Sequence, residues 1–320
     1  MKKLLAGTVA VFMALSLAAC GADNSDGNPP KNGTVALVAK ANWAQYWMKV
    51  KEGADAAGNT LGVNVSFTGP DTESEGAQQL EQLTSAIKAK PLGIGFAPQD
   101  SAQAGAVRLM DEAKAAGIPV VVFDTPLTTS EVPLGTVASD NEGMGGQSAE
   151  ELVKLIGGKG KVGVLAHGEA GTAAARRDGF KAWIAKNAPE VQVVDVQNGE
   201  SDPSTSRDKA DGILTAHPDL AGFFGTDDDS VLAAAEAVAA QGLKTAVVGI
   251  DSSPQVLTLL KEGKIRGVVV QNPYGIGYKT VEMLVEASKG SKPAQANVVS
   301  ESIWVTPANV DSKDIRKIIG

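Results

Sequence analysis

The sequence contains almost no cysteine and almost no histidine. Cys20 is the only cysteine, and His167 and His217 are the only histidines. A single cysteine cannot form a disulfide framework within the chain. A structural zinc site needs about four cysteine or histidine ligands. We therefore expect no disulfide and no metal site.

An excess of positive charge is also missing. The chain has 29 Lys and Arg residues against 37 Asp and Glu residues, which gives a formal net charge of -8. Nucleic acid is bound through a basic surface, because its phosphates are negatively charged. The charge balance therefore argues against a nucleic-acid partner.

Motifs that would indicate an enzyme are absent as well. The sequence has no GxxxxGK[ST] phosphate-binding loop and no G-x-S-x-G nucleophile elbow. Its one match to G-x-G-x-x-G, at residues 158–163, precedes the strand expected there. A dinucleotide site needs these glycines after the strand, at the start of a helix. We therefore expect no cofactor, no catalytic residue and no enzymatic activity.

The N-terminus has the layout of a secretory signal. Lys2 and Lys3 precede an apolar stretch over residues 4–17, which is shorter than the roughly 20 residues that span a bilayer. The stretch ends in Leu-Ala-Ala-Cys at Cys20, which resembles the lipobox of bacterial lipoproteins. That resemblance implies that Cys20 carries a lipid. The alternative is an ordinary signal peptide with a chance cysteine.

A polar segment follows the signal. Residues 21–33 are rich in Gly, Asn, Asp and Pro, and they lack the apolar pattern that a folded segment needs. We expect a signal peptide over 1–19 and a lipidated flexible tether over 20–33. The mature protein would then lie outside the cytoplasm, attached to the membrane by a lipid anchor.

From residue 34 onward, short apolar runs alternate with longer helical patterns. Strands are expected at residues 34–39, 63–67, 92–96, 118–123, 134–138, 161–166, 191–196, 220–225, 245–250, 265–270 and 302–306. Helices are expected at residues 46–60, 78–89, 102–116, 142–156, 173–187, 203–215, 229–241, 254–262 and 275–288. Continuously apolar strands separated by helices indicate parallel sheets that are covered on both faces. Because the expected strands are too many for a single open sheet, we expect an α/β protein with two doubly wound parallel-sheet lobes.

Polar residues gather where the expected strands end. Ligands of open α/β sheets bind beyond the carboxyl ends of the strands. The candidates at these ends are Lys40, Gln99, Asp100, Asp124, Asp140, Asn141, Arg176, Asp227, Asp251 and Gln271. A single Asp there could simply cap a helix. The combination of carboxylates, cations and amides instead suits a sugar, whose hydroxyls both donate and accept hydrogen bonds.

Aromatic residues make up only 4% of the chain, yet three of them fall within five positions. Trp43, Tyr46 and Trp47 follow the first expected strand. Flat rings suit the C–H faces of a sugar ring. The alternative is a helix that packs its apolar side into the core.

The order of several segments resembles the ribose-binding-protein-like branch of periplasmic sugar-binding proteins. The matching segments are TVALVAKANWAQYWMKVKEGA, GIPVVVFD, SDNEGMGG, ARRDGF, ILTAHPDLAGFFGTDD, VVGID and VVVQNPYGIGY. The resemblance implies two lobes joined by a three-segment hinge, with sugar in the cleft between them. It also implies ligand-binding roles for Lys40, Tyr46, Trp47, Asp124, Arg176, Asp227, Asp251 and Gln271.

Two departures from the family pattern bear on the ligand. Members specific for ribose place Arg after the carboxylate that resembles Asp124, where this chain has Thr125. Their Asn-Pro before the aromatic pair is replaced by Ala44 and Gln45. Both changes argue against ribose itself, and the additional Trp43 would reshape the pocket.

The chain order places the lobe boundaries. We expect residues 34–136 and 272–299 to form the N-terminal lobe, and residues 137–271 and 300–320 to form the C-terminal lobe. A small ligand would contact both lobes only after they close on it, and such hinge closure is a known type of motion.

The expected function is capture of a monosaccharide (a pentose, a hexose or a related polyol) by a monomer that delivers it to the membrane subunits of an ABC permease. One alternative is a receptor for a non-sugar small molecule, such as an autoinducer or a nucleoside. A second is a transcription regulator of the lactose-repressor type, but the signal peptide occupies the place of its helix-turn-helix. The sequence does not identify the sugar, its anomer or the permease.

Overall fold

The computed structural model describes residues 32–319, except for 44, 201 and 292. Cys20, the signal peptide over 1–19 and all but the end of the tether over 20–33 lie outside the described residues. Within the described part of the chain, no helix combines the length and the apolar character needed to cross a membrane.

The first lobe is built on a fully parallel sheet with the strand order β11-β5-β4-β3-β1-β2. Its strands are β1 (Thr34–Val38), β2 (Asn64–Thr68), β3 (Gly93–Phe96), β4 (Val120–Phe123), β5 (Thr136–Ser139) and β11 (Asn297–Ser300). Its helices are α1 (Gln45–Leu61), α2 (Gly76–Lys88), α3 (Ala106–Ala115) and α9 (Pro273–Ser288).

The second lobe repeats this plan with the strand order β12-β10-β9-β8-β6-β7. Its strands are β6 (Gly160–Ala166), β7 (Val191–Asn198), β8 (Gly222–Gly225), β9 (Ala246–Ile250), β10 (Gly267–Gln271) and β12 (Ser302–Val305). Its helices are α4 (Asn141–Leu155), α5 (Gly171–Asn187), α6 (Pro203–Ala216), α7 (Asp228–Ala240), α8 (Pro254–Lys261) and α10 (Lys313–Ile319). One pairing differs from the expected parallel arrangement, because β12 runs antiparallel to β10.

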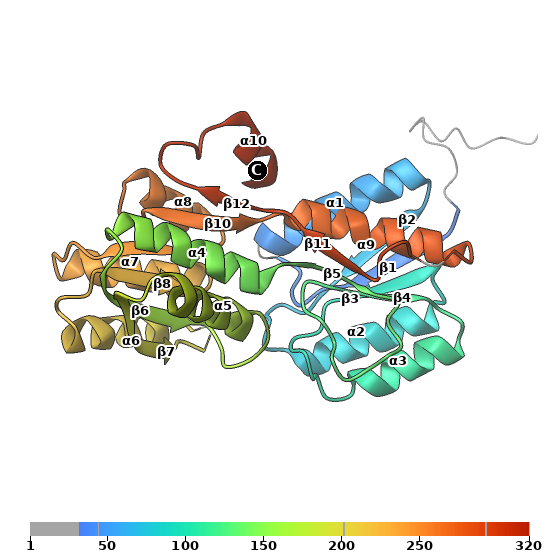
Figure 1. The fold of residues 1–320 in the computed structure, drawn as a ribbon. Coiled ribbons are helices and arrows are strands. Elements are labelled where there is room, and N and C mark those ends of the chain that lie inside the picture. Colours follow the sequence, from blue (N-terminus) through green and yellow to red (C-terminus); the bar gives the residue numbers. More distant parts are fainter. Residues whose placement is uncertain (1–31, 44, 201, 292, 320) are drawn as a thin grey trace, which may run out of the picture. The chain divides into compact units, whose positions relative to one another are not determined.

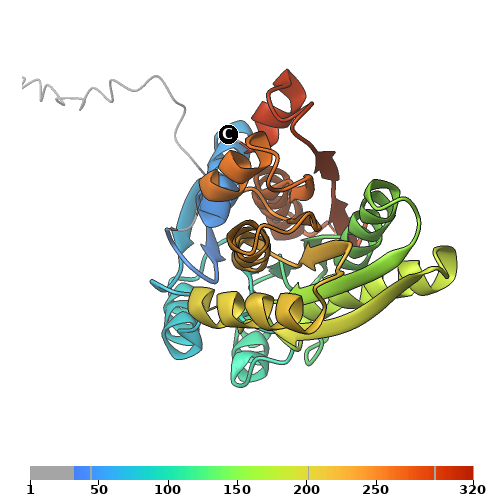
Figure 2. The ribbon, with the colours of Figure 1, turned by 90° about the vertical axis from the view of Figure 1, so that its left-hand side faces the viewer.

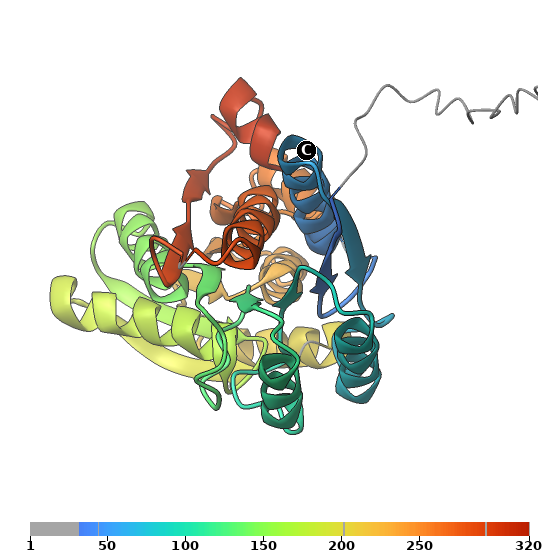
Figure 3. The ribbon, with the colours of Figure 1, turned by 90° about the vertical axis from the view of Figure 1, so that its right-hand side faces the viewer.

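Each sheet is covered on both faces, as its continuously apolar strands require. Along β1, Val35 and Leu37 pack into a core with α1 and α9. The alternate residues Ala36 and Val38 pack into a second core with α2 and α3. Figure 3 shows the first lobe from its own end, with its strands between these two pairs of helices. Figure 2 shows the second lobe in the same way, and its cores likewise lie on both faces of the sheet.

Glycine allows one pair of helices in each lobe to pack at very close range. A Cβ at Gly53 of α1 would lie 1.9 Å from the backbone oxygen of Tyr274 in α9. A Cβ at Gly179 of α5 would lie 2.1 Å from the backbone oxygen of Glu142 in α4. Figure 1 shows both pairs, with α1 beside α9 and α4 beside α5. The glycines therefore fix how the helices that follow β1 and β6 sit on their sheets.

The sequence predicted the fold class correctly, with local exceptions. Strand β11 and helix α10 were not expected. The helix expected from residue 102 begins only at Ala106, because the preceding Gly105 has a left-handed φ of 83° that a helix cannot include. Strand β5 belongs to the first sheet through Ser139, so the first crossing between lobes follows Ser139 and comes later than residue 136.

Candidate functional site

Five of the residues expected to bind ligand lie at or just beyond the carboxyl ends of strands. Lys40 follows β1, Asp124 follows β4, Asp227 follows β8, Asp251 follows β9 and Gln271 ends β10. Parallel strands bring such residues to one edge of their sheet. The two sheets meet at this edge, where Ser139 of β5 donates a hydrogen bond of 2.9 Å to the Gln271 side chain of β10.

In the first lobe, Asp124 is the centre of a buried polar group. Its carboxylate lies 2.9 Å from the Lys40 ammonium, and it accepts hydrogen bonds from Tyr46 at 2.7 Å and from Thr125 at 2.9 Å. Lys40 and Asp124 are only 7% and 8% exposed. Burial alone would raise the pKa of Asp124, but the charge of Lys40 and these hydrogen bonds lower it below its ordinary value. Asp124 is therefore ionised at neutral pH.

The pKa of the Tyr46 hydroxyl is shifted in the opposite direction to that of Asp124. Burial and the charge of Asp124 raise the pKa of Tyr46 well above its ordinary value, so the hydroxyl keeps its proton and donates a hydrogen bond to Asp124. The charges of Asp251 and Arg176, both in the second lobe, also act on Tyr46. The two lobes therefore contribute to one electrostatic environment.

In the second lobe, Arg176 has a similar central place and is 4% exposed. Its guanidinium donates through Nε to Asn141 at 2.9 Å and through Nη1 to the backbone oxygen of Thr226 at 2.8 Å. Nη1 also lies 3.4 Å from the Asp251 carboxylate, which accepts a second hydrogen bond from Gln271. The arrangement fixes the guanidinium plane and the carboxylate relative to each other.

Two site residues have unusual backbone angles. Asp124 and Asp251 have φ values of 63° and 79°, in the left-handed region that side chains with a Cβ rarely adopt. Aspartate tolerates this region better than most residues. Such strain is concentrated at functional sites, which adds weight to these two positions.

Asp227 caps a helix, as a single strand-end Asp could, and it also lies near the site. Its Oδ1 accepts a hydrogen bond of 3.0 Å from the backbone N–H of Ser230 and so caps α7. Its Oδ2 lies 3.7 Å from Nδ1 of His167. Burial lowers the pKa of His167 despite this carboxylate, so the imidazole is neutral at pH 7.

The three aromatic residues do not share one environment. Tyr46 and Trp47 pack edge to face, with ring centroids 4.9 Å apart, and Trp47 is 1% exposed. Trp43 is 66% exposed, and its indole N–H donates to the backbone oxygen of Asp71. The structure therefore brings Tyr46 and Trp47 to the polar group but does not bring Trp43 there.

Several residues near the site were not among the expected ligands. Thr125 and Ser139 bond to expected site residues, and their positions next to strand ends were the available signal. Asn141 was already a strand-end candidate, and it accepts a hydrogen bond from Arg176. Asp228 accepts a hydrogen bond of 2.8 Å from the backbone of Ser253. Burial, together with the charges of Asp251 and Asp227, raises the pKa of Asp228 to about 8.

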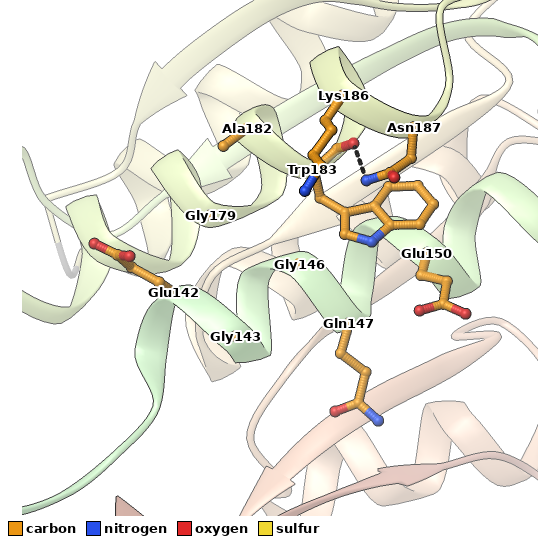
Figure 4. A pocket seen from close by; sticks show the side chains of 10 residues that line it. All are labelled: Glu142, Gly143, Gly146, Gln147, Glu150, Gly179, Ala182, Trp183, Lys186 and Asn187. Atoms are coloured by element: carbon orange, nitrogen blue, oxygen red, sulfur yellow. Dashed lines mark hydrogen bonds between the residues drawn. The ribbon is translucent and has the colours of Figure 1, made fainter.

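A hollow of about 590 Å³ lies elsewhere, between α4 and α5 of the second lobe (Figure 4). Trp183 of α5 stands beside Gly146 of α4, and Glu142 and Glu150 lie along α4. None of the expected ligand-binding residues lines it. Among the residues that the structure describes, no group of three or more His, Cys, Asp or Glu side chains could hold a metal ion.

The fold and the strand-end group place the chain in a known class. A family model described as a periplasmic binding protein domain matches residues 35–292, and the chain belongs to this family. The family implies a location outside the cytoplasm.

The relatives include named transport proteins. The chain is 30% identical over 296 residues to the ribose import binding protein RbsB of Escherichia coli, covering 91% of this chain and 94% of that protein. It is 27% identical over 267 residues to the D-allose-binding periplasmic protein of the same organism, covering 80% and 85%. It also resembles the solved structure of a carbohydrate transporter solute binding protein from Agrobacterium radiobacter in complex with D-arabinose. That likeness has a TM-score of 0.81 and 28% identity, and it covers 90% of this chain and 99% of the other. These relatives are transport binding proteins and not enzymes.

Proposed function

We propose that the chain captures a monosaccharide between its lobes and delivers it to the membrane subunits of an ABC importer. The observation that carries the proposal is the pair of charged groups at the strand ends. Asp124 with Lys40 lies in the first lobe, and Arg176 with Asp251 lies in the second. Gln271 bonds to Asp251 and to Ser139, so it connects the two lobes beside this group.

The chemistry of these groups matches a sugar. Each sugar hydroxyl can donate to a carboxylate and accept from an ammonium or guanidinium group. Hydrogen bonds that involve a charged partner are stronger than those between neutral groups. Because the carboxylates and cations are already paired in the protein, their charges are compensated, and a neutral ligand with several hydroxyls can bind without leaving a buried charge uncompensated.

A thermal-shift screen tests this function. The panel is D-ribose, D-allose, D-arabinose, D-glucose and sorbitol, with adenosine as a non-sugar ligand. A ligand at 100 times its Kd stabilises the fold by about 2.7 kcal/mol, which corresponds to roughly 4–5 °C in Tm for a chain of this size. We expect at least one sugar or polyol to produce this shift. A shift with adenosine alone would contradict the proposal and favour a receptor for a non-sugar molecule.

Capture is proposed to close the lobes. The chain crosses between the two sheets after β5, after β10 and after β11. Three short connections resist twisting while permitting bending, and a ligand that contacts both lobes stabilises the closed form. Small-angle scattering should show a smaller radius of gyration when the best sugar of the screen is added. Size-exclusion chromatography should show a monomer with and without sugar.

We also propose that the chain is attached to the membrane through a lipid on Cys20, because the apolar stretch ends in Leu-Ala-Ala-Cys. Cys20→Ala removes the thiol that would receive the lipid. We expect this variant to appear in the soluble extracytoplasmic fraction, whereas the unaltered chain should remain with the membrane. Continued membrane association of Cys20→Ala would contradict the anchor.

A further inference from the structure

The loop between β2 and α2, residues 69–75, is held by hydrogen bonds to the segment after β1 that carries Trp43, Tyr46 and Trp47. Asn42 donates from its backbone to the Pro70 oxygen at 3.1 Å and from its side chain to the Gly69 oxygen at 2.9 Å. The Trp43 indole donates to the backbone of Asp71. These contacts hold the loop in place without any contribution from Glu73.

Glu73 adds a side-chain contact from this loop to the aromatic segment. Its carboxylate accepts a hydrogen bond of 2.7 Å from the indole N–H of Trp47. Glu73 itself is exposed, whereas Trp47 is 1% exposed. A buried indole N–H needs an acceptor, and an ionised acceptor makes a stronger bond than a neutral one. Glu73 thus fixes the polar edge of a ring that is otherwise held only by packing.

The ring in turn contacts the polar group of the first lobe. Trp47 packs edge to face against Tyr46, with centroids 4.9 Å apart, and against Phe123, with centroids 6.3 Å apart. The Tyr46 hydroxyl donates to Asp124, which pairs with Lys40. A continuous series of contacts therefore runs from the exposed Glu73 to the buried carboxylate.

We propose that Glu73 is a positioning residue for sugar binding: it holds the Trp47 ring, which sets the direction in which Tyr46 and Asp124 present themselves to the ligand. The proposal rests on the proposed function, because it assigns Glu73 an effect on sugar affinity. It does not require Glu73 to touch the sugar.

Glu73 could instead act through its charge. Asp229, at the start of α7 in the second lobe, has its pKa raised to about 6 by burial and by Asp227, with smaller contributions from Asp202 and Glu73. Glu73 and Asp229 are thus close enough to repel each other across the lobes. The two roles differ in what a neutral acceptor at position 73 would do, since Gln keeps the hydrogen bond and removes the charge.

The first experiment measures affinity by calorimetry with the sugar that gives the largest shift in the screen. Glu73→Ala should weaken binding about tenfold, because the bond to a charged acceptor is lost. Glu73→Gln should stay within about twofold of the unaltered protein, since it retains the acceptor. Glu81→Ala, which removes an exposed carboxylate from nearby α2, is the matched control and should bind normally. Equal losses in Glu73→Gln and Glu73→Ala would overturn the proposal in favour of charge.

A double-mutant cycle separates positioning from direct contact with the sugar. Trp47→Phe keeps a ring but removes the N–H. In that background, Glu73→Ala should cause no further loss of affinity. A full tenfold loss in the Trp47→Phe background would mean that Glu73 acts independently of Trp47, and the proposal would fail.

A spectroscopic measurement tests the bond without any sugar. The Trp47 indole signal in a ¹H–¹⁵N spectrum is identified by its absence in Trp47→Phe. It should move upfield in Glu73→Ala and stay close to its original position in Glu73→Gln. If no sugar binds the unaltered protein, the proposed function fails, and this shift still decides whether Glu73 holds Trp47. An unmoved signal in Glu73→Ala overturns the positioning role even if sugar binds.

Discussion

The two lobes share one strand order, although their last strands run in different directions relative to their neighbours. The strand order β2-β1-β3-β4-β5-β11 of the first corresponds to β7-β6-β8-β9-β10-β12 of the second. Gly53 and Gly179 each lie eight residues after the first residue of α1 and α5. Asp124 and Asp251 follow corresponding strands, and both have φ in the left-handed region. Each lobe therefore delivers its side chains to the site with the same backbone geometry.

The chemistry at corresponding positions nevertheless differs. Five residues after the first residue of the helix, α1 has the buried Val50 and α5 has Arg176. One residue after the helix start, α1 has Tyr46 and α5 has Thr172. The first lobe thus contributes rings and a lysine–aspartate pair, and the second contributes a guanidinium group. The backbone thus determines where a side chain is presented, while the chemistry of that side chain changes independently.

The largest expected difference between the lobes concerns their ion pairs. The Lys40 and Asp124 side chains are 9% and 10% exposed, whereas those of Arg176 and Asp251 are 5% and 19% exposed. Asp124→Ala leaves the Lys40 ammonium buried without its partner, which should cost about 3–5 kcal/mol of unfolding free energy. Asp251→Ala leaves Arg176 with Asn141 and Thr226 and should cost about 1–2 kcal/mol. Urea denaturation measures both, and equal losses would contradict the distinction.

The next effect is on affinity. Arg176→Ala should weaken sugar binding by about 1.5–3 kcal/mol, or roughly ten- to a hundredfold. Val50→Ala, at the corresponding position of α1, should cost about 2 kcal/mol of stability through a cavity but leave affinity nearly unchanged. Calorimetry beside thermal denaturation separates the two. Unaltered affinity in Arg176→Ala would remove this residue from the site.

The lobes should also respond differently to pH. The pKa of Asp124 is lowered, so its ionised form stabilises the fold, and this contribution is lost as the pH falls through the folded-state pKa. The pKa of Asp228 is raised to about 8, so the folded state favours its protonated form and loses stability as the pH rises from about 4 toward 8. Asp228→Asn should therefore raise the Tm by several degrees at pH 9 and have little effect at pH 4. A uniform shift at both pH values would show that the gain does not come from titration.

The smallest expected effect concerns a single hydroxyl. Tyr46→Phe removes the hydrogen bond to Asp124 and keeps the ring, which should weaken sugar binding by about 1–2 kcal/mol. Thr172→Val at the corresponding position of α5 should have almost no effect, because its hydroxyl lies 3.5 Å from His167. Calorimetry on both variants tests the asymmetry, and equal losses would mean that the first lobe has no special role.

Most of the fold could be predicted from the sequence because its signals are local. Apolar runs predicted the strands, and Pro203 and Pro254 are the first residues of α6 and α8. Strand β11 was missed because it has only four residues, two of them exposed. Its position depends on pairing with β5, which lies more than 150 residues earlier and leaves no local pattern.

The location of most candidate site residues at the strand ends was predictable to a similar degree, while their role in ligand binding stays a prediction. The carboxyl ends of strands gave Lys40, Asp124, Asp251 and Gln271, and the structure connects these by ion pairs or hydrogen bonds to other site residues. The sequence did not reveal Glu73, because a loop glutamate has no periodicity and its partner lies 26 residues away. Nor could it show that Trp43 and Trp47, four residues apart, differ so widely in exposure.

The late position of α9 and β11 has a consequence for the order in which the chain can fold. The first sheet begins at Thr34, but the helix that packs against α1 and the strand that completes the sheet come only at residues 273–300. A ribosome therefore has to synthesise nearly the whole chain before the first lobe can assemble the core that lies against α1 and α9, whereas the core against α2 and α3 needs only residues 36–127. Until then the emerging segment lacks one layer of helix packing and remains open. The first lobe can therefore be completed only late in synthesis, after the strands of the second lobe up to β10 have been made.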